Sequence, residues 1–239
     1  MKYQILKFAA IAMVCAPFSA VSLPGFGTGS AYAGCSDTAA AGVDWSDCRK
    51  RNLIMSGSDF SGSNLSGADL SSSDLREANF TNANLSKANL VRASLKGVSA
   101  TNSDFSRILA SRSNFSNGDF TNADFSKAET SRVDFSSSTF TSADMSKAEF
   151  ARANFSGSQM SGVNFDFSNL ARADLRGITY DKAPSFKNSF LYQTRLEGLD
   201  LSGSTELQVW QINLACGDEN TVLPSGMERP ETWPCSDDS

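Results

Sequence analysis

The sequence repeats with a period of five residues between positions 55 and 180. A bulky apolar residue, called the central residue below, starts at Met55 and recurs at every fifth position as far as Tyr180. The residue two places earlier is mostly small, and Asp or Asn often stands between the two, as in Ala68-Asp69-Leu70. Of the 26 central positions, only three carry a small or polar residue: Ala100, Ala110 and Thr130.

A step of five residues suits neither an α-helix nor a flat strand. On a helix each step turns the side chain by about 140°, which spreads the apolar residues around the axis. On a strand, odd steps point successive central residues to opposite faces. The pattern requires a chain that turns a corner every five residues, with two side chains inside and Ser, Gly, Asn or Asp at the turns. A fixed short period of this kind predicts a solenoid.

Two runs of the repeat, residues 68–72 (Ala-Asp-Leu-Ser-Ser) and residues 123–127 (Ala-Asp-Phe-Ser-Lys), resemble the pentapeptide repeat family, whose consensus is Ala-(Asp/Asn)-Leu-x-x. The resemblance covers residues 53–203. It implies an all-β fold, a right-handed, four-sided β-helix with 20 residues per coil. About 30 repeats would then make seven or eight coils. The resemblance implies little about function, because the repeat is an architectural unit.

The distribution of Lys and Arg supports a coil of 20 residues. The second position after each central residue, from Gly57 to Gly177, comprises 25 sites, which such a coil divides among four faces. Two adjacent faces hold 12 of these sites and nine basic residues, whereas the other 13 sites hold none. The first set, the Lys/Arg column, is Lys87, Arg107, Lys127 and Lys147, and the second, the Arg column, is Arg92, Arg112, Arg132, Arg152 and Arg172. These nine residues form the candidate interaction surface.

Cations stacked about 4.8 Å apart repel by roughly 0.8 kcal/mol per neighbouring pair in water. Acidic rows are expected beside them, with Asp104, Asp124 and Asp144 in one line and Glu129 and Glu149 in another. Two interpretations follow. The rows form a solvated network of surface ion pairs, or the cations bind an anionic polymer or a charged envelope protein.

Residues 1–33 are typical of an export signal. Lys2 and Lys7 accompany an uncharged apolar stretch, and Ala31-Tyr32-Ala33 places small residues at the positions that specify cleavage. The stretch is too short for a membrane-spanning helix, so the mature chain is expected to have no transmembrane segment and to be periplasmic or secreted. An uncleaved anchor is the alternative. Cleavage removes two of the 21 basic residues and none of the 26 acidic ones, which leaves a net charge of −7.

The mature chain keeps four cysteines, which allow three pairings. They form one close couple at each end of the chain, which favours Cys35–Cys48 and Cys216–Cys235 disulfides in an oxidising compartment. Lipidation of Cys35 is an alternative, because residues 33–35 (Ala-Gly-Cys) resemble the end of a bacterial lipoprotein signal. That signal normally has an aliphatic residue where this chain has Tyr32, and lipidation would leave Cys48 without a local partner.

The period slips by one residue after Tyr180, so one residue is inserted within positions 181–185 and the central residues become Phe186, Leu191, Leu196 and Leu201. We predict an N-terminal cap over 34–52, the solenoid over 53–203 and a C-terminal cap over 204–239, because open end coils expose backbone edges. Ser204 is expected to cap a helix over residues 205–214 whose buried face holds Leu207, Trp210 and Leu214. The tail after this helix resembles a covering strap of bacterial family members.

The composition excludes several classes of enzyme. The chain contains no His, so Ser-His-Asp triads, Cys-His pairs and imidazole bases are absent. Its acidic balance opposes binding to nucleic acid, and its carboxylates are expected on a convex wall rather than across a cleft. We therefore predict no catalytic residue, cofactor or metal site, and an exported, non-enzymatic structural or interaction module. The alternative is a DNA-mimicking topoisomerase inhibitor, as the quinolone-resistance branch of the family implies, although that function requires an anionic surface and a cytoplasmic location.

Overall fold

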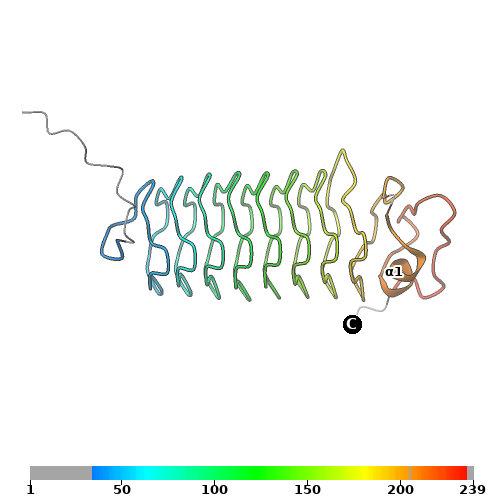
Figure 1. Cartoon of the computed structure of the whole chain (residues 1–239). Coiled ribbons are helices and arrows are strands. Elements are labelled where there is room, and N and C mark those ends of the chain that lie inside the picture. The colour runs from blue at the N-terminus through cyan, green and yellow to red at the C-terminus, as the bar shows by residue number, and fades with distance from the viewer. Residues whose placement is uncertain (1–33, 205, 236–239) are drawn as a thin grey trace, which may run out of the picture. The chain divides into compact units, whose positions relative to one another are not determined.

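The computed structural model describes residues 34–204 and 206–235. The predicted export signal over residues 1–33 lies outside the described residues. The described chain winds into successive coils that stack along one axis (Figure 1). Parallel backbone bridges join residues 20 positions apart, from Asp44 with Asn64 to Gln159 with Thr179. The predicted coil of 20 residues is therefore confirmed over this stretch.

Each side of a coil contributes one bridged residue instead of a long strand, because a corner follows every five residues. A corner is a four-residue turn, in which the N–H of Ala68 donates to the C=O of Leu65 (3.1 Å) and Gly67 has φ of +67°. The Asp or Asn before a central residue supports the next corner. For example, Asp104 Oδ1 accepts the N–H of Ser106 at 2.8 Å. The Asp and Asn residues of the repeat are thus turn-forming residues.

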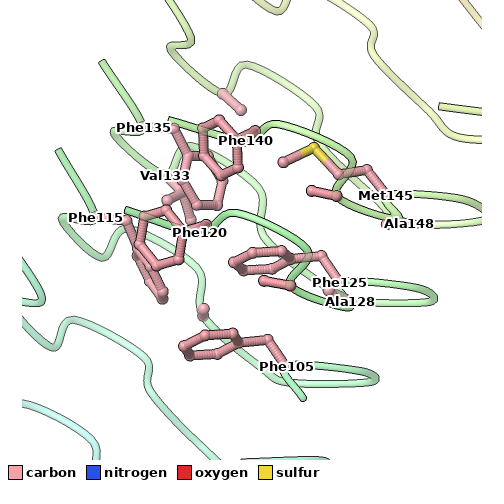
Figure 2. Close-up of a cluster of buried hydrophobic side chains, with 14 of the residues drawn as sticks. Phe105, Phe115, Phe120, Phe125, Ala128, Val133, Phe135, Phe140, Met145 and Ala148 are labelled. Carbon is pink, nitrogen blue, oxygen red and sulfur yellow. The ribbon is translucent and has the colours of Figure 1, made fainter. Parts of the chain in front are cut away.

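The central residues fill the interior, and all of them from Phe60 to Leu175 are fully buried. Rings of successive coils stack, as Phe105 does on Phe125 with centroids 4.8 Å apart (Figure 2). Rings from neighbouring sides meet edge to face, as Phe120 and Phe125 do at 5.5 Å. Each fully buried side chain of this size stabilises the fold by about 2–3 kcal/mol. The regular interior therefore supplies the apolar burial that holds the coils together.

Serine occurs at the small inward position of this apolar interior, and several of its hydroxyls bond to the backbone, although the buried Ser168 hydroxyl has no partner among the described residues. Ser113 Oγ donates to the C=O of Leu90 (2.6 Å), and Ser158 Oγ donates to the C=O of Phe135 (2.9 Å). Both hydroxyls are buried, and each bonds to the preceding coil. A buried hydroxyl with such a partner avoids the cost of an unpaired polar group.

The predicted one-residue insertion is confirmed. The bridges change from an offset of 20 residues to one of 21, as in Asn164 with Ser185 and Asn169 with Phe190. The extra residue lies in a loop at 181–184 that projects from the coils (yellow in Figure 1). The central residues predicted after the slip are all buried: Phe186, Leu191, Leu196 and Leu201.

The bridged coils begin within the segment that the sequence assigns to the N-terminal cap, because Asp44 already pairs with the next coil. Trp45 occupies a central position there and packs edge to face on Phe60, with centroids 5.3 Å apart. Cys48 is buried and forms a disulfide with Cys35, which is the pairing expected from the sequence. The disulfide ties the segment that precedes the first coil to that coil.

The helix of the C-terminal cap differs from the prediction. Helix α1 spans Val209–Leu214, so it begins later than residue 205, and its N-cap is Gln208. Ser204 does not cap it, because Ser204 is buried and its N–H closes one more solenoid corner on the C=O of Leu201 (2.9 Å). The predicted apolar face is wrong as well, since Trp210 is 45% exposed.

The buried residues of α1 are Gln211 and Ile212. Gln211 Nε2 donates to the C=O groups of Phe186 (2.7 Å) and Ser189 (2.9 Å). A further coil would normally supply a backbone N–H to the C=O of Ser189, so the side-chain amide replaces that donor, whereas the C=O of Phe186 also accepts the N–H of Ser189 (3.1 Å). Beyond α1, a Cys216–Cys235 disulfide closes the covering segment. No helix within residues 34–204 and 206–235 has both the length and the apolar character needed to cross a membrane.

Candidate functional site

The nine cations of the predicted surface lie in two columns at two adjacent corners of the coils. Within the Lys/Arg column, the N–H of Lys87 donates to the C=O of Ser106 (2.9 Å), and the N–H of Lys127 donates to the C=O of Ser146 (3.0 Å). These bonds place each corner directly against the equivalent corner of the next coil. All nine side chains are exposed.

The backbone of each of these nine residues is left-handed, with φ between +58° and +62°. Glycine adopts this conformation freely and Asn tolerates it, whereas a long side chain there costs of order 1 kcal/mol. The other two corners carry mainly Gly, Asn and Ser, as turn geometry favours. The two cationic columns therefore hold residue types that the turn itself does not select.

The nine cations have no carboxylate partner among the described residues. The ion pairs of the described chain involve other cations, namely Arg76–Asp74, Arg176–Asp174, Lys187–Glu206 and Arg195–Glu197. Within the two columns, only Arg172 has a polar side-chain partner, since its Nε donates to Gln193 Oε1 (2.8 Å). The described contacts thus contain no ion-pair network that includes these columns.

The acidic rows are present, but they form no ion pair with the cationic columns among the described residues. Asp124 is bridged to Asp104 on one side and to Asp144 on the other, and its Oδ1 accepts the N–H of Ser126 at 2.7 Å. Glu129 and Glu149 are bridged to each other and stand between the two cationic columns. We call the surface bounded by the two columns the cationic face; it comprises residues 87–92, 107–112, 127–132, 147–152 and 167–172.

Arg76 shows the geometry of an ion pair in this repeat. It directly follows the central Leu75, and its guanidinium donates to both carboxylate oxygens of Asp74, at 2.8 and 2.6 Å. These hydrogen bonds lower the pKa of Asp74 and raise the pKa of Arg76. The cations of the two columns stand one residue later, at the left-handed corner, and make no such bond within the described chain.

The sequence matches the pentapeptide repeats in eight copies, and the matched segments are 54–90, 88–126, 119–157 and 131–166. The chain belongs to the pentapeptide repeat family. A comparison of this pentapeptide repeat protein with curated proteins gave no match.

Solved structures of other pentapeptide repeat proteins resemble the chain. HetL, a protein involved in heterocyst differentiation regulation from the cyanobacterium Nostoc sp. strain PCC 7120, is 19% identical, with 81% of each chain covered and a TM-score of 0.56. A trypsin-treated form of QnrB1, a plasmid-mediated fluoroquinolone resistance protein, is 16% identical, with 72% of this chain and 90% of QnrB1 covered and a TM-score of 0.42. The likeness to HetL implies a right-handed β-helix, and at this identity it shows the fold alone.

The pentapeptide repeats also present aromatic residues that the sequence analysis did not identify. Phe167 takes the place of the next cation in the Lys/Arg column, and it is 53% exposed. Phe190 and Tyr192 lie one coil further along, and both are exposed. The signal was available in the sequence, because the slipped register makes Leu191 central and leaves its two neighbours outside.

The remaining site predictions concern metals and catalysis. Within the described parts of this pentapeptide repeat protein, no three His, Cys, Asp or Glu side chains are grouped so that they could hold a metal ion. The carboxylates described above stack along the outer sides of the coils, one per coil in each row.

Proposed function

We propose that this pentapeptide repeat protein is an exported, non-enzymatic interaction module whose cationic face binds a linear anionic polymer of the cell envelope. The observation that carries the proposal is the set of nine exposed cations in two parallel columns, none of which has a carboxylate partner among the described residues. Cations without a carboxylate partner among the described residues can neutralise charges on a ligand.

The repetition of the cations favours a polymer over a compact ligand. Equivalent corners recur once per coil, at about 4.8 Å, so the cationic face offers the same pair of charges again and again along its length. A polymer with regularly spaced anionic groups meets many of these pairs at once. Its binding releases condensed counterions, and this makes the affinity depend steeply on salt.

Two observations support export. The first 33 residues have the features of a signal, and both cysteine couples of the mature chain are disulfides. The Cys35 sulfur forms a disulfide with Cys48. We therefore do not expect Cys35 to be lipidated, because a lipid would have to be attached to the same sulfur. The intact mass of protein purified from its native host tests the location. We expect a chain that starts at Gly34 and gains four hydrogens on reduction, two for each disulfide, whereas a lipid adduct or a retained signal would contradict the proposal.

Binding to polygalacturonate, a polymer of uronic acids, tests the cationic face. The triple variant Arg112→Gln, Arg132→Gln, Arg152→Gln removes three charges from the centre of the Arg column. We expect weaker binding and a plot of log affinity against log salt that is shallower by about 2, since each lost contact removes about 0.7 from the slope.

The matched control removes three charges from another side of the coils, through Arg76→Gln, Lys96→Gln and Arg176→Gln. It changes the net charge by the same amount and should leave the slope close to that of the unmodified protein. Equal losses in the two triple variants would show that binding follows net charge and not the cationic face, and would refute the proposal.

A further inference from the structure

The aromatic end of the cationic face carries an inference that rests on the proposed function and extends it. Phe167 follows Lys147 in the Lys/Arg column and has a left-handed backbone, with φ of +59°. It is the only aromatic residue with positive φ in the described chain. Left-handed corners recur throughout the coils, but a bulky aromatic residue is unfavourable in this conformation, so Phe167 is a residue that the turn itself does not select.

Two further aromatic side chains lie on the next coil of the same surface. Asn169, on the cationic face, is bridged to Phe190, and the N–H of Arg172 donates to the C=O of Tyr192 (2.8 Å). The rings of Phe190 and Tyr192 are stacked, with centroids 6.2 Å apart and planes 12° apart. They are 44% and 41% exposed. The cationic face thus ends in three exposed aromatic side chains: the stacked pair Phe190 and Tyr192 and, one coil earlier, Phe167 at the corner. We call these three residues the aromatic platform.

Three of the nine large exposed hydrophobic residues of the described chain lie together at this end of the cationic face, namely Phe167, Phe190 and Tyr192. Leu109 is also exposed between the two columns, but it stands three coils away. Isolated exposed apolar residues are ordinary, whereas a cluster in line with a charged face indicates a binding surface. Arg172 joins the two parts, because its Cζ lies 6.0 Å from the centroid of the Tyr192 ring.

The chemistry between the two columns discriminates among anionic polymers. Glu129 and Glu149 lie between the columns and have no cationic partner in the described chain, so they favour a polymer that brings hydrogen-bond donors to them, which the phosphates of a nucleic acid do not. Sugar hydroxyls can donate to those carboxylates, of which Glu149 also accepts from Asn169 Nδ2 (2.8 Å). They can also donate to the amide oxygens of Asn89 and Asn169, each of which accepts one backbone N–H and has a second lone pair. The C–H faces of a sugar ring also suit the electron-rich face of an aromatic ring.

We propose that the ligand is an acidic polysaccharide and that the aromatic platform is its sugar-stacking subsite. The chain of sugars runs along the cationic face, with its carboxylates toward the two columns and its hydroxyls toward the acidic and amide side chains between them. One or two sugar rings stack on the aromatic platform at one end. The aromatic platform therefore recognises the sugar ring, while the columns recognise the charge.

The test compares polygalacturonate with polyglutamate, which carries carboxylates but no sugar ring, and with single-stranded poly(dT). The variants are Phe167→Asn, which also suits a left-handed corner, and the double variant Phe190→Ala, Tyr192→Ala. We expect the double variant to bind polygalacturonate about tenfold more weakly and polyglutamate unchanged. Ile54→Ala, which truncates a residue that is 85% exposed outside the cationic face, is the control and should change neither affinity. Circular dichroism checks that the variants are folded.

The outcomes separate this inference from the proposed function. If the unmodified protein binds both carboxylate polymers and the aromatic variants leave both affinities unchanged, the proposed function stands and the sugar-stacking subsite is refuted. If poly(dT) binds more tightly than polygalacturonate and loses affinity in the aromatic variants, the aromatic platform stacks bases and the inference is again refuted. If none of the three polymers binds, both the proposed function and the inference fail.

Discussion

Neutralising the centre of the Arg column should leave the protein at least as stable as before, and more stable at low ionic strength. The perturbation is the triple variant Arg112→Gln, Arg132→Gln, Arg152→Gln. The column of five Arg residues contains four neighbouring pairs, and each pair includes at least one replaced residue. Because none of these residues has a carboxylate partner in the described chain, the substitutions remove repulsion and no ion pair.

The magnitude follows from the coil spacing. At about 4.8 Å each pair repels by roughly 0.8 kcal/mol in water, so four pairs amount to an upper bound of about 3 kcal/mol. Long side chains can spread apart, and salt with a Debye length of about 10 Å at 0.1 M weakens the repulsion further. We expect the free energy of unfolding to rise by about 1 kcal/mol at low ionic strength and to change little at high ionic strength.

Urea unfolding, followed through tryptophan fluorescence, measures this effect at low and high salt, because Trp45 and Trp233 are buried. Added salt should stabilise the unmodified protein and have less effect on the triple variant. Arg76→Gln is the control, because it removes a real ion pair with Asp74 and should destabilise the protein by at most about 1 kcal/mol. A triple variant that is less stable than the unmodified protein at low salt, or an unmodified protein that loses stability as salt is added, would refute the reasoning.

Three further predictions concern the fold. Phe125→Ala should lower the free energy of unfolding in urea by about 3–5 kcal/mol, because the ring packs against Phe105 in the interior. Phe125→Asp should prevent folding, because it buries a charge without a partner. An unchanged melting temperature for either variant would contradict the inward placement of Phe125. Gln211→Leu should lower the melting temperature, at a cost of about 1–3 kcal/mol, because the buried C=O of Ser189 loses its donor and the C=O of Phe186 loses one of several. Val209→Leu in the same helix should have little effect. The N–H of Ser61 donates to the Asp59 carboxylate and lowers the pKa of Asp59 below its ordinary value of 3.8. This hydrogen bond therefore stabilises the fold above pH 3.8, and its contribution is lost as the pH falls through the native pKa of Asp59. The variant Asp59→Asn should lack this pH dependence in urea unfolding between about pH 5 and 2.

Prediction from the sequence succeeded where one coil repeats the chemistry of the last. The membership of the two cationic columns, the insertion at 181–185 and the central residues that follow it depend only on counting residues at a fixed period. The disulfide partners were predictable because each couple is close in sequence. These features require no knowledge of distances between side chains in space.

Prediction failed at the C-terminal end, where the period stops. An amphipathic helix pattern placed Trp210 on the buried face and Ser204 at the N-cap, yet Trp210 is exposed and Ser204 completes another corner. The decisive interaction is polar, since Gln211 supplies hydrogen bonds to carbonyl groups at the open edge. A hydrophobic pattern cannot reveal this, because it contains no information about which backbone groups lack partners.

Counting residues at a fixed period was enough to predict the coil of 20 residues, its interior and the alignment of nine cations in two columns, because equivalent positions of a strict repeat must stack. The contacts of the folded chain were needed to show that these cations occupy left-handed corners without carboxylate partners among the described residues, and that the stacked, exposed rings of Phe190 and Tyr192 lie one coil beyond Phe167. Ion pairing and ring stacking depend on distances of a few ångströms between residues of different coils. Those distances are set by the turn geometry and by the one-residue slip in register, and not by the period alone.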